Sequence, residues 1–270
     1  MNFPKIDVVI PCYNAEKTII RAVNSVLSQP QLNHLWLVDD GSTDNTLQLA
    51  DLIAKQYPDK VTIEKLPRNV GVAKARNWGA LQTTTEFVAF LDADDAYEPE
   101  ALTVAASVFH FRPEVGVVRL ALKPVDLAER YVSHPEFKRA WETMQMTCGG
   151  NMIFRRTFFF ACGGFPQDLI FRDLGGEDGA LGIATTRMSS VATLFDDVGV
   201  LHYCREGMHA QRLLDSLLFD KQNHGISKEK LTQADKVTER ICEGIKALKL
   251  CLNTDRIGVK PLLIERSDEE

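Results

Sequence analysis

Short apolar runs alternate with amphipathic segments over residues 6 to about 122. The runs are rich in β-branched residues and too short for helices, so we expect strands at residues 6–10, 35–38, 61–66, 87–91 and 115–122. Between them, apolar positions three and four apart predict helices over residues 19–27, 49–57 and 72–81, and from Pro99 onward. Strands that alternate with helices are typical of an α/β fold, with a mostly parallel central sheet and helices on both faces.

Two residues are expected to bound the first of these elements. Pro11 should end the first strand, because proline cannot donate to a central ladder. Asn14 is the expected cap of the helix that follows.

The second half of the chain is less regular. A helix is expected over residues 134–146, and strands near 191–195 and 198–203. From residue 228 to 253, apolar positions step by threes and fours and predict a long amphipathic helix. We therefore expect one domain over residues 1–225, with two halves that meet near residue 122, and a C-terminal amphipathic helix and tail over 226–270.

Composition narrows the partners of this domain. The 270 residues carry a formal net charge of −6, which argues against a nucleic-acid partner. The six cysteines show no metal-binding spacing and are expected to be reduced thiols. No run approaches the ~18 to 20 apolar residues of a membrane span, and no signal peptide precedes the first strand. These observations predict a cytoplasmic protein without a transmembrane segment, and a peripheral place at the inner membrane face is the alternative.

Acidic residues follow two of the predicted strands. Asp39 comes directly after one strand, and Asp92-Ala93-Asp94-Asp95 follows another. Right-handed crossovers place both strand ends at one edge of the sheet, where ligands of open α/β sheets bind. Asp92 and Asp94 are two residues apart and can face one site, so the pattern favours a hard divalent cation beside a nucleotide diphosphate. The alternative is a turn in which Asp95 caps the next helix.

Three further clusters are candidates for chemistry. Gly175-Gly176-Glu177-Asp178-Gly179 combines close backbone approach with acids that could act as a general base, or it is a glycine-rich turn. Residues 69–77 put Arg76 and Lys74 near a helix start, which suits phosphate recognition or a solvated helix face. His202, near Arg205, is a candidate for a metal or pyrophosphate site, although a lone histidine is more often structural.

Five blocks in this order resemble the family 2 glycosyltransferases. The blocks are Val-Val-Ile-Pro-Cys-Tyr-Asn at 8–14, Leu-Val-Asp-Asp-Gly-Ser-Thr-Asp at 37–44, Asn-Val-Gly-Val-Ala-Lys-Ala-Arg-Asn at 69–77, Leu-Asp-Ala-Asp-Asp at 91–95 and Gly-Gly-Glu-Asp at 175–178. The resemblance covers residues 6 to about 180 and implies the GT-A fold, a Rossmann-like architecture. It also implies that the half to about residue 122 binds the nucleotide and that the half from 123 to 225 binds the acceptor.

The resemblance also implies roles for individual residues. The segment from Pro11 to Glu16 would line the nucleoside, with Tyr13 against the base. The residues expected on the nucleotide are Pro11, Tyr13, Asn14, Glu16, Asp39, Asn69, Arg76, Asp92 and Ala93. Those expected at a Mn²⁺ or Mg²⁺ ion are Asp94, Asp92 and His202. Asp178 would be the catalytic base, with Glu177 beside it.

These roles imply a metal-dependent, inverting transfer of one sugar from a nucleotide-sugar donor, with a UDP-sugar favoured. The acceptor is a hydroxyl of a glycan or lipid-linked molecule, in the synthesis of a polysaccharide, glycolipid or cell-surface glycan. The Gln-x-x-Arg-Trp motif of processive synthases is absent from the sequence, which favours single transfers. The alternatives are a sugar nucleotidyltransferase and a non-catalytic nucleotide-sugar-binding protein. For the C-terminal stripe, packing on its own domain and formation of a homodimer are both open.

Overall fold

A seven-stranded sheet forms the centre of the computed structural model, which describes residues 2–205, 207–220 and 228–252. Its order is β3-β2-β1-β4-β8-β6-β9. Neighbouring strands are parallel except at β8, which runs antiparallel to both β4 and β6. The strands are β1 (Ile6–Cys12), β2 (Leu32–Asp39), β3 (Val61–Lys65), β4 (Phe87–Phe90), β6 (Val117–Leu120), β8 (Met152–Arg155) and β9 (Val191–Leu194).

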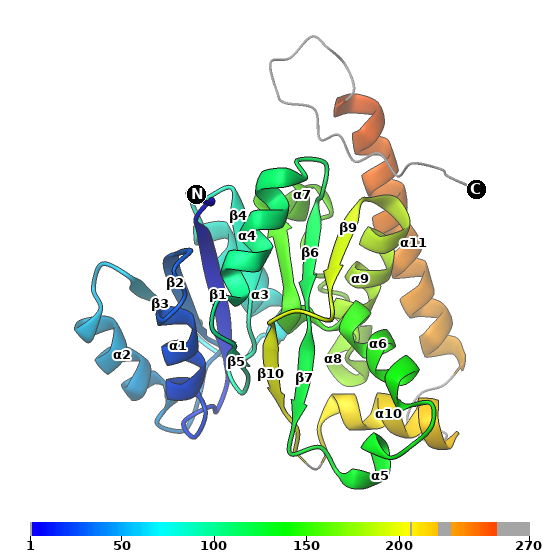
Figure 1. The fold of residues 1–270 in the computed structure, drawn as a ribbon, viewed down its shortest axis with the longest axis horizontal. Helices are drawn as coiled ribbons and strands as arrows, with labels where there is room; N and C mark the ends of the chain where they lie inside the picture. Colours follow the sequence, from blue (N-terminus) through cyan, green and yellow to red (C-terminus); the bar gives the residue numbers. More distant parts are fainter. Residues whose placement is uncertain (1, 206, 221–227, 253–270) are drawn as a thin grey trace.

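Helices cover both faces of this sheet (Figure 1). Alternate residues of β1 face opposite layers, so Val8 belongs to one apolar cluster and Val9 to the other. The first cluster takes in α1 (Ile19–Leu27), α2 (Thr46–Gln56), α4 (Ala101–Phe111), α6 (Phe137–Thr147) and α10 (His209–Phe219). The second takes in α3 (Val72–Gln82), α7 (Arg156–Ala161), α8 (Ile170–Leu174), α9 (Glu177–Met188) and α11 (Lys228–Leu252).

The predicted α/β class is therefore confirmed, and the predicted helix over 19–27 has the bounds of α1. The remaining predicted elements of the first half are present with ends shifted by a few residues, except the strand predicted over 115–122. That segment is two strands in two sheets. Strand β6 ends at Leu120. After Ala121, β7 (Leu122–Val125) pairs with β10 (Val200–Tyr203) in a small sheet of order β5-β10-β7, in which β5 is Ala96–Tyr97.

Three predicted boundaries are wrong for local reasons. Strand β1 continues through Pro11 to Cys12, because its ladder with β4 has already ended at Val9 and the missing N–H is not needed there. Asn14 does not cap α1, which begins at Ile19 after a turn; its backbone has φ 50°. Helix α4 begins at Ala101, two residues after Pro99.

Strand β8 is the strand of the central sheet that the sequence pattern did not predict. It comes from residues 152–155, yet it lies between β4 and β6 in the sheet. The two expected halves of the domain therefore share one continuous sheet.

Helix α11 confirms the predicted C-terminal amphipathic helix. Its stripe of Val237, Ile241 and Ile245 is buried in the cluster that includes Leu181 of α9, so the helix packs on its own domain. The tail predicted after residue 252 lies outside the described residues. Within the described part of the chain, no helix has the length and apolarity required to cross a bilayer.

Close packing at the β10 end of the small sheet yields a stability prediction. A Cβ added at Gly199 would lie 2.2 Å from the carbonyl oxygen of Ala121. This carbonyl accepts a hydrogen bond from Val200 N at 2.8 Å, so the backbone cannot shift freely. We expect Gly199→Ala to lower the free energy of unfolding by about 1–3 kcal/mol and the melting temperature by roughly 3–10 °C.

Gly244→Ala is the matched control, measured by the same thermal unfolding. A Cβ at Gly244 of α11 meets nothing within 4 Å, and alanine has the higher helix propensity. This variant should be at least as stable as the unmodified chain. Equal melting temperatures for the two variants would contradict the packing argument.

Candidate active site

Asp39 lies at the end of β2 and is 4% exposed. Its Oδ2 accepts a hydrogen bond from Ser42 N at 3.3 Å. Its Oδ1 is buried and has no hydrogen-bond partner among the described residues. A buried carboxylate oxygen without a donor is costly, so this atom is suited to a ligand N–H.

Asn14 and Glu16 hold the loop after Asp39 in place. Asn14 Oδ1 accepts a hydrogen bond from Thr43 N at 2.8 Å, and Glu16 Oε2 accepts one from Asn45 N at 3.1 Å. The side chain of Tyr13, which precedes Asn14, is half exposed. The structure therefore brings these expected nucleoside residues, together with Pro11 at the end of β1, beside Asp39.

Asp40 fixes the loop that carries Asn69. Its two carboxylate oxygens accept hydrogen bonds from Val70 N at 2.7 Å and Gly71 N at 2.9 Å. Burial raises the pKa of Asp40, while the two amides act in the opposite direction. A Cβ at Gly41 would lie 2.7 Å from Asn69 N, so Asn69 also comes close to the turn after β2.

The Asp92–Asp95 turn directs its three acids to different partners. Asp92 Oδ1 pairs with Arg76, and Asp94 Oδ2 lies 3.0 Å from Arg205 Nη2. Asp95 is fully buried and does not cap α4; its Oδ2 lies 2.8 Å from His202 Nδ1. Burial raises the pKa of Asp95 to about 6.

His202 and Asp94 fit the chemistry of a divalent-cation site. His202 Nε2 is buried and has no hydrogen-bond partner among the described residues, and Asp95 holds the opposite ring nitrogen. A carboxylate behind a histidine is a common arrangement at metal ligands. Burial, followed by the charge of Asp92, raises the pKa of Asp94, while Arg205 opposes the shift. Among the described residues, no three His, Cys, Asp or Glu side chains are grouped as a ready cation site.

Arg76 connects the two halves of the site. Its side chain is almost fully buried in α3, with Nη2 2.5 Å from Asp92 Oδ1 and Nη1 3.3 Å from Glu177 Oε1. One guanidinium thus joins an acid after β4 to an acid at the start of α9. Lys74 of the same helix is exposed, which agrees with the alternative interpretation of this cluster as a solvated helix face.

Glu177 and Asp178 occupy the first turn of α9, where the helix dipole favours negative charge. Asp178 Oδ2 accepts a hydrogen bond from Gly149 N at 2.9 Å, and its Oδ1 accepts one from Gly179 N at 2.8 Å. Burial raises the pKa of both acids, that of Glu177 to about 7, with the charge of Asp178 as the second cause. Arg76 opposes the shift at both.

Gly149 and Gly150 lie against charged side chains of the site, and the sequence analysis did not identify them as site residues. A Cβ at Gly149 would lie 2.9 Å from Arg76 Nη1, and one at Gly150 would lie 2.9 Å from Asp92 Oδ2. A larger residue at either position would displace the charged groups, because the backbone passes directly against them. A Gly-Gly pair just before an apolar strand was the available indication.

Comparison with known proteins shows the family of the chain. The pattern of Glycosyl transferase family 2 matches residues 7–165. An uncharacterized glycosyltransferase of Nostoc sp. is 41% identical over 115 residues, which are 42% of this chain and 35% of the relative. The chain thus aligns with about a third of that relative's length.

Two solved structures share the fold at low identity. Staphylococcus aureus TarS 1–349 in complex with UDP-GlcNAc has a TM-score of 0.60 and 22% identity, over 90% of this chain and 73% of its own. The mannosyltransferase PcManGT of Pyrobaculum calidifontis, in complex with GDP-Man and Mn²⁺, has a TM-score of 0.60 and 20% identity, over 93% and 75%. The GT-A fold is confirmed, and with the family pattern covering more than half of the sequence, the chain belongs to glycosyl transferase family 2.

Proposed function

We propose that this glycosyltransferase moves one sugar from a UDP-sugar to an acceptor hydroxyl, with Mn²⁺ or Mg²⁺ and with inversion at the anomeric carbon. The observation that carries the proposal is the meeting at Arg76 of Asp92, from the donor side, and Glu177, beside Asp178. Transfer requires a donor diphosphate and an acceptor base within one site, and this arrangement provides for both.

Uracil is the base that best suits Asp39. The unpartnered Oδ1 can accept the imide N–H of uracil, and the half-exposed ring of Tyr13 offers a surface on which a base can stack. TarS was solved with UDP-GlcNAc and PcManGT with GDP-Man, so the shared fold accommodates both kinds of nucleotide in those proteins.

Asp94 and His202 would hold the cation, with Asp92 adjacent. The ion, when bound, supplies positive charge next to the leaving diphosphate. Arg205, which now pairs with Asp94, is close enough to add a second positive charge to this region.

Asp178 is the proposed base. Its carboxylate takes the proton from the acceptor oxygen as that oxygen attacks the anomeric carbon, and the nucleoside diphosphate leaves from the opposite side. A single displacement of this kind inverts the configuration. Hydrogen bonds from the amides of Gly149 and Gly179 hold the carboxylate in one orientation, and lone pairs remain for the acceptor.

The acceptor is proposed to be a glycan or lipid-linked hydroxyl, met by the half of the domain after residue 122. A cytoplasmic location, with or without contact to the inner membrane face, suits such substrates.

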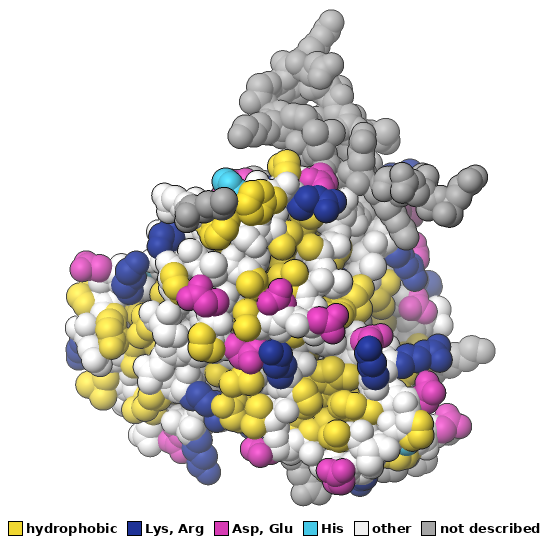
Figure 2. Space-filling model, in the orientation of Figure 1, with side chains coloured by type: hydrophobic (Ala, Val, Ile, Leu, Met, Phe, Trp, Pro, Cys, Tyr) yellow, Lys and Arg dark blue, Asp and Glu magenta, His cyan; other side chains and the backbone are white. Residues whose placement is uncertain are grey.

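Figure 2 shows acidic and basic side chains interspersed over the face it draws, which is unlike the basic surface of a nucleic-acid-binding protein.

The nucleotide assignment leads to a binding prediction. Calorimetry should show UDP binding more tightly than GDP, and more tightly with Mn²⁺ than with EDTA. Asp94→Ala should remove the gain from Mn²⁺ while leaving the metal-free affinity within about threefold, since the base contact at Asp39 is untouched. GDP binding at least as tight as UDP would refute the base assignment, and an unchanged Mn²⁺ gain in the variant would move the metal elsewhere.

The two acids at the start of α9 should respond differently to substitution. Asp178→Asn removes the basicity and should lower turnover ~10²-fold or more, with donor affinity nearly intact. Glu177→Gln should lower turnover less, because Glu177 pairs with Arg76 and helps to position the site without taking the proton. Steady-state rates of UDP release and separate donor affinities decide between them. An inactive Glu177→Gln enzyme beside an active Asp178→Asn enzyme would reverse the roles.

Glu177 also predicts a pH dependence of stability. Its pKa rises from 4.5 to about 7 on folding, so the native state holds a proton that the unfolded chain has lost between these values. The free energy of unfolding should therefore fall as pH rises from about 4.5 to 7. Urea unfolding at several pH values in this range should show that the free energy of unfolding falls less steeply with pH in Glu177→Gln than in the unmodified chain. Parallel curves for the two proteins would show that Glu177 does not titrate in this window.

A further inference from the structure

Phe165 closes one side of the Arg76 guanidinium. The ring is fully buried, and its centroid lies 5.0 Å from Arg76 Cζ, within range of a cation–π contact. The rings of Phe90 and Phe159 pack against Phe165 at 5.0 and 5.6 Å, so its side chain has little freedom. Arg76 thus meets two carboxylates and one aromatic ring.

Asn77, the next residue of α3, holds the backbone of Phe165. Its Nδ2 donates to Phe165 O at 2.8 Å, and its Oδ1 accepts from Phe165 N at 2.9 Å. The side-chain amide therefore pairs with both polar groups of one peptide residue, in the manner of a strand neighbour. A Cβ at Gly164 would lie 2.6 Å from Asn77 Oδ1, and Gly164 has φ 71°, so the chain needs glycine to reach this position.

Arg76 and Asn77 are adjacent on a helix and point about 100° apart. Arg76 extends to the acids, and Asn77 extends to Phe165, whose ring returns to Arg76. This closed loop of contacts fixes the guanidinium from a direction that neither Asp92 nor Glu177 supplies.

We propose that Asn77 and Phe165 are positioning residues that set the orientation of Arg76, and through it the placement of Asp92 and Glu177. The residues act without touching substrate. The expected effect on catalysis rests on the proposed function, whereas the expected effect on the orientation of Arg76 does not.

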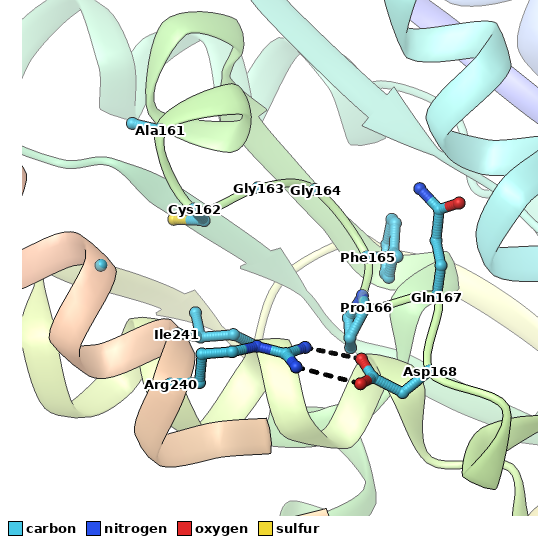
Figure 3. Close-up of a pocket in the computed structure, with 11 residues that line it drawn as sticks. Ala161, Cys162, Gly163, Gly164, Phe165, Pro166, Gln167, Asp168, Arg240 and Ile241 are labelled. Atoms are coloured by element: carbon cyan, nitrogen blue, oxygen red, sulfur yellow. Dashed lines mark hydrogen bonds and ion pairs between the residues drawn. The ribbon is translucent and has the colours of Figure 1, made fainter. Parts of the chain in front are cut away.

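The opposite side of the same segment supplies a control. Figure 3 shows residues 161–168 lining a cavity of about 500 Å³, with Arg240 reaching Asp168 from α11. Arg240 donates two hydrogen bonds to Asp168, at 3.0 and 2.6 Å. This pair also ties the segment with two hydrogen bonds, but Arg240 is exposed to solvent, so the loss of the pair should matter little.

The test compares Asn77→Ala with Arg240→Gln in the full chain. The Nε–H resonance of Arg76, assigned through its loss in Arg76→Lys, reports guanidinium orientation without any assay of transfer. Asn77→Ala should shift this resonance and lower kcat about 10- to 100-fold, while UDP affinity stays within about threefold. Arg240→Gln should leave the resonance and kcat unchanged.

If Asn77→Ala does not fold, Phe165→Met takes its place in the test. This substitution keeps the apolar volume and the Asn77 contact but removes the ring. It should shift the same resonance and lower kcat in the same range. An unmoved Arg76 resonance with kcat within twofold in a folded variant would overturn the inference, and so would an equal effect from Arg240→Gln. If the unmodified enzyme transfers no sugar, the proposed function fails, and the resonance alone decides the positioning role.

Discussion

The buried guanidinium of Arg76 is the interaction on which the site depends. Asp92, Glu177 and Asp178 come from a turn after β4 and from the first turn of α9. Without a cation, their mutual repulsion would drive these carboxylates apart, and burial would protonate them. Arg76 offsets both effects by pairing directly with two of them. Removal of the guanidinium would leave these buried carboxylates uncompensated, so the arrangement depends on Arg76 more than on any one of its acids. The glycines at 149 and 150 exist in this structure because the backbone must approach that charge cluster closely.

Much of the fold follows from local pattern. The alternation of apolar runs and helical stripes in residues 6–111 located the elements of the first half, since each buries one continuous face. The prediction of one strand over 115–122 was wrong because a continuous apolar run does not reveal that its two ends pair with partners in different sheets. Strand β8 was missed for a related reason: four residues after two glycines carry no periodicity, and only their place between β4 and β6 makes them a strand.

The sequence pointed to the acidic residues of the candidate site. It did not indicate which residues they contact. Strand-end position pointed to Asp39 and Asp92, and the glycine-rich block pointed to Glu177 and Asp178. The partners could not be deduced, because Arg76 and Glu177 are 101 residues apart in sequence. Asp95 shows the same limit. Its sequence position fits a helix cap, whereas its carboxylate is buried against His202, which returns from a strand more than 100 residues later.

The place of β8 in the sheet has a consequence for motion. Because this strand joins β4 to β6 by ladders on both sides, the segments before and after residue 122 cannot swing apart as two rigid bodies without breaking backbone hydrogen bonds. Any rearrangement that keeps the central sheet intact must therefore come from the loops that the sheet presents, such as the turn after β2. The frame stays fixed, and the sequence of those loops can change without redesign of the core.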